Sequence, residues 1–135
     1  MPSKPRPRAG RRARTVLIVE DQIEMRAICS AYLQHHGYRV LAADNGAEGL
    51  RAAREEHPDL IFMDISVPVM DGITATAELK RDPATAGIPI VIVTAHPYGS
   101  AGRRAVDAGC DGWLNKPCDP RRLLAEVQQR LGAAA

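Results

Sequence analysis

The sequence predicts one α/β domain in which a parallel sheet lies between two layers of helices. Short runs of apolar, largely β-branched residues alternate with segments of helical character, which gives five expected strands and five expected helices. The chain has 135 residues, the size of one domain, and its 45% apolar content is ordinary for a globular protein. The apolar runs are continuous because parallel strands in such a sandwich are buried on both faces.

The first expected strand is Thr15–Val19, an apolar run (TVLIV) followed by two acidic residues. The helix expected over residues 22–36 has one stripe of small and apolar residues, namely Ile23, Ala27 and Ala31. Gly37 follows it and suits the positive φ of a helix end. A second strand is expected over residues 38–42.

Asn45 is expected to cap a helix that runs to Glu56, and the pair His57-Pro58 predicts an extended link after it. The third strand, residues 60–63, leads directly into Asp64. A helix over residues 73–81 and a fourth strand over residues 89–93 follow, with Pro89 acceptable only as the first residue of that strand. The remaining expected elements are a helix over 99–108, a short strand over 112–114 and an amphipathic helix over Pro120–Leu131.

Charge divides the chain into unlike parts. Of the 18 Lys and Arg residues, six lie in residues 1–14, which hold no acidic residue, so the rest carries 12 basic against 16 acidic side chains. We expect a basic, disordered arm at 1–14, a mildly acidic domain at 15–131 and a short tail at 132–135. The arm is either a solvated tail or a weak electrostatic contact for nucleic acid or another anionic surface.

Other classes of protein are disfavoured by what the sequence lacks. It has no apolar run long enough to span a membrane and no secretory h-region, so we expect a cytoplasmic protein. The three cysteines, Cys29, Cys110 and Cys118, lack metal-ligand spacing and are interpreted as reduced, packed thiols.

Polar residues stand where the expected strands end. Glu20 and Asp21 follow the first strand, Asp64 ends the third, Thr94 and Ala95 follow the fourth, and Lys116 follows the fifth. Because functional groups gather at the carboxyl ends of parallel strands, we expect these side chains to meet at one edge. Clustered carboxylates need a cation, and oxygen ligands favour Mg²⁺.

This set of residues suits phosphoryl transfer. A carboxylate can accept a phosphoryl group as an acyl phosphate, while Mg²⁺, an ammonium and a hydroxyl offset the charge on its oxygens. Taken alone, each residue has an ordinary explanation as a helix cap, a turn hydroxyl or a surface lysine. Their order at consecutive strand ends carries the prediction.

The segments LIVED, MDISVPVMDG, PIVIVTA and GWLNKP resemble the receiver domain of bacterial two-component response regulators, over about residues 15–131. The resemblance implies a flavodoxin-like (βα)5 fold with strand order 2-1-3-4-5. It implies Asp64 as the phosphoacceptor and a Mg²⁺ site formed by Glu20, Asp21, Asp64 and the backbone carbonyl of Ser66. It further implies that Thr94, Ala95 and Lys116 contact the phosphoryl group, and that the Lys116-Pro117 peptide bond is cis.

Three further roles follow from the resemblance by position. Trp113 stands where a switch aromatic follows Thr94, although Tyr or Phe is commoner there and simple packing is the alternative. Ser66 and His96 stand two residues beyond Asp64 and Thr94, at positions that influence how fast the acyl phosphate hydrolyses. For His96, a solvated loop residue is the alternative.

The expected function is that of a stand-alone phosphoacceptor, which receives its phosphoryl group from a sensor histidine kinase or a phosphotransfer protein. We expect its output to be contact with a downstream protein, with a homodimer through the face of the fourth helix, fifth strand and fifth helix left open. A turnover enzyme is disfavoured, because Ser66 stands where aspartate-nucleophile phosphatases carry a general acid. The main alternative is a phosphorylation-independent binding module with the same fold.

Overall fold

The computed structural model describes residues 13–95 and 99–132 of the chain. One parallel sheet of five strands has the order β2-β1-β3-β4-β5, as predicted. The strands are β1 (Thr15–Val19), β2 (Arg39–Ala43), β3 (Leu60–Asp64), β4 (Ile90–Thr94) and β5 (Gly112–Asn115). The helices are α1 (Ile23–His35), α2 (Gly46–Glu56), α3 (Gly72–Arg81), α4 (Ser100–Ala108) and α5 (Pro120–Leu131).

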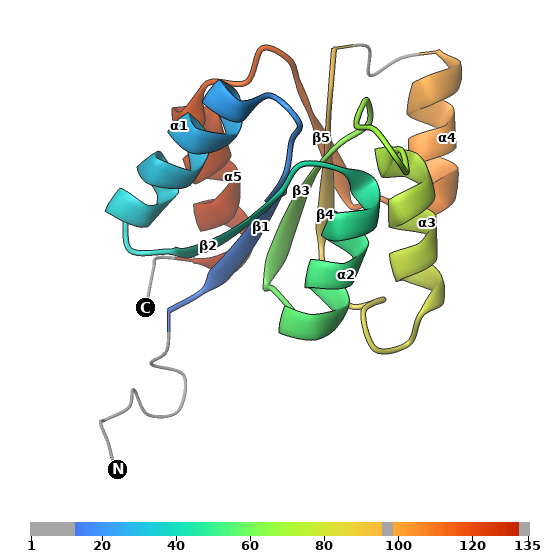
Figure 1. Ribbon diagram of the computed structural model, residues 1–135, viewed down its shortest axis with the longest axis horizontal. Helices are drawn as coiled ribbons and strands as arrows, with labels where there is room; N and C mark the ends of the chain where they lie inside the picture. Colours follow the sequence, from blue (N-terminus) through green and yellow to red (C-terminus); the bar gives the residue numbers. More distant parts are fainter. Residues whose placement is uncertain (1–12, 96–98, 133–135) are drawn as a thin grey trace.

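The helices cover the sheet as two layers (Figure 1). Helices α1 and α5 pack on one face and α2, α3 and α4 on the other, so the expected three-layer sandwich is confirmed. Each face has its own apolar cluster, because neighbouring residues of a buried strand point to opposite sides. Leu17, for example, belongs to the cluster under α2 and α3, whereas Val16 and Ile18 belong to the cluster under α1 and α5.

Strand β2 begins one residue later than predicted. Tyr38 is buried, but its amide donates to the Leu33 carbonyl at 3.1 Å and so completes the end of α1. Its hydroxyl donates to the Gly132 carbonyl beyond α5 at 3.1 Å. The backbone enters the sheet only at Arg39, which pairs with Thr15 of β1.

The stripe of small and apolar residues expected on the first helix does not face the core, so that prediction is wrong. Ile23 is 71% exposed, and Ala27 and Ala31 are exposed as well. The buried residues of α1 are Cys29 and Leu33, with Met25 partly buried against the same cluster. The helix has apolar residues on both sides, so its sequence does not decide which side meets the sheet.

Of the three helix ends with a specific expectation, two are confirmed and one is wrong. Asn45 accepts a hydrogen bond from the Glu48 amide at 2.8 Å, and Gly37 has φ 95°. The extended link expected at His57 is wrong, because His57 takes the left-handed conformation (φ 48°, ψ 63°) and its amide bonds to the Ala53 carbonyl. A left-handed cap ends the helix before Pro58 without placing His57 in the right-handed region that a following proline disfavours.

No helix in the described parts of the chain is long and apolar enough to cross a membrane. Residues 1–12 of the expected basic arm and 133–135 of the expected tail lie outside the described residues.

Candidate functional site

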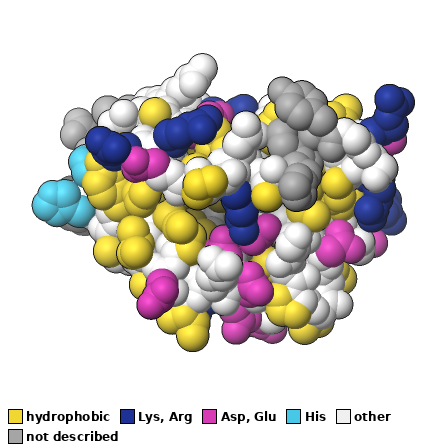
Figure 2. Space-filling view, turned by 90° about the horizontal axis from the view of Figure 1, so that it is seen from above, with side chains coloured by type: hydrophobic (Ala, Val, Ile, Leu, Met, Phe, Trp, Pro, Cys, Tyr) yellow, Lys and Arg dark blue, Asp and Glu magenta, His cyan; other side chains and the backbone are white. Residues whose placement is uncertain are grey.

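Three acidic side chains meet at the carboxyl edge of the sheet. Glu20 and Asp21 follow β1, and Asp64 is the last residue of β3, the strand that pairs with β1. Each offers a carboxylate oxygen, and these three atoms lie within 4.8 Å of one another. Figure 2 shows this edge from above, where acidic side chains gather beside a basic one near the middle of the face.

Asp64 is held by contacts to both of its carboxylate oxygens. The residue is 3% exposed. Its Oδ1 accepts a hydrogen bond from the Ser66 amide at 3.0 Å, and its Oδ2 lies 2.6 Å from the Lys116 Nζ. Asp64 is therefore a buried, oriented carboxylate with a cation beside it.

Lys116 also reaches the second buried acid. Its Nζ lies 3.5 Å from Glu20 Oε1. Burial raises the pKa of Glu20, and the negative charge of Asp64 raises it further, against the lowering effect of the Gln22 amide and of Lys116. Burial would lower the pKa of Lys116, but Asp64 and Glu20 outweigh it, so that pKa is raised. The Lys116 ammonium thus contacts two of the three clustered carboxylates, and the cluster has more acidic groups than this one cation can balance.

The turn between β1 and α1 is fixed by contacts that sequence reasoning missed. The Gln22 amide donates to Glu20 Oε2 at 3.0 Å, and Arg26 Nη1 donates to the Glu20 carbonyl at 2.9 Å. The Glu20 amide donates to the carbonyl of Ala43, the last residue of the neighbouring strand β2, at 3.0 Å. Nothing in the sequence singles out Gln22 or Arg26, since their contacts depend on the path of the turn.

Thr94 and Lys116 are brought together as predicted. Thr94 ends β4 and is 8% exposed, and its carbonyl accepts the Lys116 amide at 2.8 Å. Ala95 follows on the exposed side of this edge. The Lys116-Pro117 peptide bond is cis, which confirms that prediction. His96 lies outside the described residues.

Trp113 lies on β5, opposite Ile92 of β4, and is 45% exposed. The ring is therefore not part of the core in this conformation. Its role as a switch residue is a prediction that the fold leaves open.

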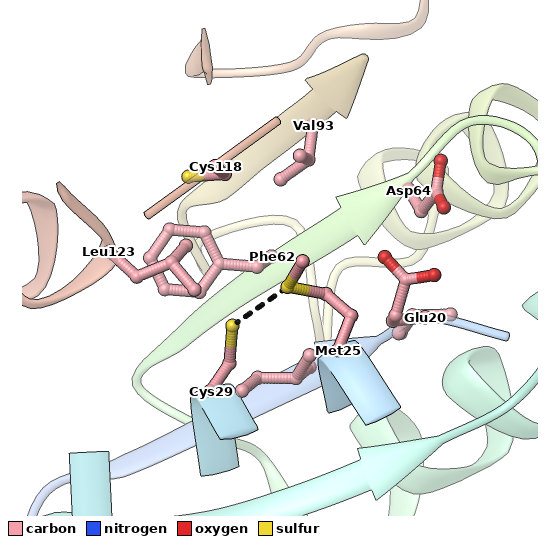
Figure 3. A pocket seen from close by; sticks show the side chains of 10 residues that line it. Glu20, Met25, Cys29, Phe62, Asp64, Val93, Cys118 and Leu123 are labelled. Carbon is pink, nitrogen blue, oxygen red and sulfur yellow. Dashed lines mark hydrogen bonds between the residues drawn. The ribbon is translucent and has the colours of Figure 1, made fainter. Parts of the chain in front are cut away.

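A cleft runs inward from the acidic edge between α1 and the loop after β5. Its outer part, about 260 Å³, is lined by the charged residues Glu20 and Lys116 and by apolar residues such as Met25 and Pro117. A smaller cavity of about 30 Å³ continues beneath it. In Figure 3 the carboxylates of Glu20 and Asp64 lie at one end of this cavity, and Cys29, Cys118 and Leu123 lie at the other.

The response-regulator receiver domain is the family whose model matches this chain, over residues 16–128. The chain belongs to the receiver-domain family. Asp64, Lys116 and the two acids after β1 all lie within the matched region.

Curated relatives of this receiver domain match over nearly their whole length. The protein PilH of Pseudomonas aeruginosa is 37% identical over 112 residues, which cover 83% of this chain and 93% of PilH. The polar-differentiation response regulator DivK of Brucella ovis is 34% identical over 121 residues, 90% of this chain and 98% of DivK.

Solved structures agree with the fold of this receiver domain. The Vibrio cholerae chemotaxis protein CheY4 superposes with a TM-score of 0.82 at 32% identity and covers 89% of this chain and 100% of its own. The receiver domain of the sensor histidine kinase PA1611 from Pseudomonas aeruginosa, solved with a magnesium ion coordinated in its active-site cleft, has a TM-score of 0.82 at 30% identity. That match covers 90% of this chain and 100% of the PA1611 domain.

The acidic cluster fits a hard divalent cation. All three grouped side chains offer oxygen atoms, Asp21 is exposed while Glu20 and Asp64 are buried, and their charge exceeds that of Lys116. Mg²⁺ prefers such a site, which offers a few protein ligands, all of them oxygen atoms, and leaves one side open to water.

Proposed function

We propose that this receiver domain accepts a phosphoryl group on Asp64 in a Mg²⁺-dependent reaction. A phosphohistidine on a sensor kinase or phosphotransfer protein would be the donor. The bond between phosphorus and the imidazole nitrogen breaks as a bond forms between phosphorus and an Asp64 oxygen. The imidazole leaves with the electron pair, and Asp64 becomes an acyl phosphate.

The observation that carries this proposal is the pair of contacts on Asp64. A buried carboxylate whose two oxygens are held by the Ser66 amide and the Lys116 ammonium is oriented before any donor arrives. Lys116 can move from the carboxylate to a phosphoryl oxygen, because it is bound to Asp64 only by a charge-assisted hydrogen bond.

Glu20, Asp21, Asp64 and the backbone carbonyl of Ser66 would hold the Mg²⁺ ion. The bound ion would supply positive charge that offsets the charge developing on the phosphoryl oxygens. Thr94 and the backbone of Ala95 stand beside Lys116 at the same edge and would contact the phosphoryl group. Ser66 and His96 would influence how long it persists.

The output would be a change at the face formed by α4, β5 and α5. Thr94 would move toward the phosphoryl group, and the half-exposed Trp113 would follow it inward. A downstream protein would distinguish the two states of this face. The domain would act as a signalling module and not as a turnover enzyme. The position two residues after Asp64, where a phosphatase of this kind has an acidic residue as general acid, is occupied by Ser66.

The test is the intact mass of the purified chain after incubation with acetyl phosphate, with Mg²⁺ or with EDTA. We expect a gain of one phosphoryl group that requires Mg²⁺. Asp64→Asn is the matched control, because it keeps the shape of the side chain and removes the nucleophile. A folded wild-type chain that gains no phosphoryl group would instead support a phosphorylation-independent binding module.

A further inference from the structure

The loop between β3 and α3 contains a backbone conformation that its residue type does not favour. Val69 has φ 71°, and the Met70 amide donates to the Pro68 carbonyl at 2.7 Å. A hydrogen bond that spans one residue with positive φ forms a γ-turn of the strained kind. A β-branched residue in this region is an outlier, because its side chain crowds the backbone.

The Val69 side chain does not explain why the turn persists. It is 83% exposed and belongs to neither apolar cluster. An exposed valine in a strained turn must be held there by the chain on either side of it.

The neighbouring segments provide that constraint. Gly46, the first residue of α2, lies so close to the loop that an added Cβ would overlap the Met70 carbonyl. At Gly72 an added Cβ would overlap the Asp64 carbonyl, and the Gly72 amide donates to the Ile65 carbonyl at 3.0 Å. The loop is therefore closed back onto the end of β3, and it is pressed against α2 at the same time.

The closed loop contains Ser66, whose amide contacts the Asp64 carboxylate. Val67, between Ser66 and the turn, is 7% exposed and anchors the loop in the core beneath the site. A loop fixed at Val67 and reversed at Val69 leaves the Ser66 backbone little freedom relative to Asp64.

We infer that Val69 is a positioning residue for the cation site: its left-handed turn, held against Gly46, keeps the Ser66 backbone in place beside Asp64. This inference rests on the proposed function, because it concerns the Mg²⁺ site of that function. The conformation of residue 69 is what matters, and its side chain contributes nothing.

The test measures the Mg²⁺ affinity of the full chain by titration calorimetry, without any phosphodonor. Val69→Gly and Val69→Asn permit a positive φ, so both should bind Mg²⁺ as the wild type does. Val69→Pro fixes φ at a negative value and should weaken binding by roughly 10-fold or more, the loss typical of disturbing residues that orient metal ligands.

A second variant disturbs the same loop from helix α2. Gly46→Ala displaces the Met70 carbonyl without altering any acidic residue, and it should weaken Mg²⁺ binding as Val69→Pro does. Gly87→Ala is the matched control, since an added Cβ there meets nothing within 4 Å and Mg²⁺ affinity should not change. A cooperative urea-unfolding transition in EDTA would establish that each variant is folded.

Wild-type Mg²⁺ affinity in a folded Val69→Pro or Gly46→Ala chain would overturn the inference, and so would a large loss of affinity in Val69→Gly. A wild-type chain that binds no Mg²⁺ would instead contradict the proposed function itself.

Discussion

Lys116 and Asp64 are 52 residues apart in the sequence, yet the Lys116 Nζ lies 2.6 Å from Asp64 Oδ2. The contact joins the ends of two strands that are separated by β4 in the sheet. It places the single lysine of the site on the one carboxylate that is proposed to be the nucleophile.

Removing the Lys116 charge should make the fold more dependent on Mg²⁺. Lys116→Gln leaves two buried carboxylates, Glu20 and Asp64, without their cation. Since Lys116 is partly exposed, we expect a loss of about 1–3 kcal/mol in the free energy of unfolding in EDTA, less than for a fully buried pair. Urea unfolding with and without Mg²⁺ should show a larger gain from Mg²⁺ in the variant than in the wild type.

Lys80 provides a matched control. Its side chain is 16% exposed, against 27% for Lys116, and its Nζ contacts the carbonyls of Ala86 and Ile88 and the carboxylate of Asp111, away from the acidic edge. Lys80→Gln should lose stability, but its gain from Mg²⁺ should equal that of the wild type. Equal gains in both lysine variants would show that Lys116 does not neutralise the cation site.

The loss of stability at low pH, measured as the free energy of unfolding, should depend on Asp119. Hydrogen bonds from the Arg121 side chain and amide lower the pKa of this α5 cap to about 2. The pKa is lowered on folding, so the contribution is present above the unfolded value of 3.8 and is lost as the pH falls toward 2. Asp119→Asn, which keeps a capping oxygen, should be less stable than the wild type at neutral pH, and the difference should shrink between pH 4 and 2.

The measurement is the midpoint of urea unfolding for both chains across this pH range. A difference that stays constant down to pH 2 would mean that the charge of Asp119 does not contribute.

Trp113 is the single tryptophan of the chain, so its fluorescence reports on one site. It is 45% exposed, and acrylamide should quench it readily in the unphosphorylated chain. If Trp113 follows Thr94 inward, the quenching constant should fall once the chain is phosphorylated. Thr94→Ala should still accept the phosphoryl group but should keep the high quenching constant. Unchanged quenching in a phosphorylated wild-type chain would remove Trp113 from the switch.

The two sides of α1 should differ in their sensitivity to truncation. Leu33 is fully buried, whereas Ile23 is 71% exposed. We expect Leu33→Ala to lower the free energy of unfolding by about 2–5 kcal/mol and Ile23→Ala by less than about 0.5 kcal/mol. Chemical denaturation measures both, and similar losses would mean that α1 packs in another orientation.

The same helix shows where sequence reasoning reaches its limit. The runs that form β1 and β3 are buried throughout and apolar except at Thr15 and Asp64, so both strands and the acids at their ends could be placed from the sequence alone. The face of α1 could not, because it depends on the turn that Arg26 and Gln22 hold at the Glu20 backbone and carboxylate.

The candidate site likewise has a part that could be predicted from the sequence and a part that could not. Its charged residues could be predicted, since parallel strands bring their carboxyl ends to one edge. The backbone that positions them could not, because the γ-turn at Val69 and its closeness to Gly46 follow from contacts between segments far apart in the chain.

The measurement that tests the central claim most directly is the position of the phosphoryl group. After incubation with acetyl phosphate and Mg²⁺, borohydride reduces an acyl phosphate to an alcohol, and tandem mass spectrometry of the peptides then identifies the modified residue. The account predicts reduction at Asp64 in the Mg²⁺-treated chain and none in EDTA. A reduced or phosphorylated residue elsewhere, with Asp64 unchanged, would contradict it.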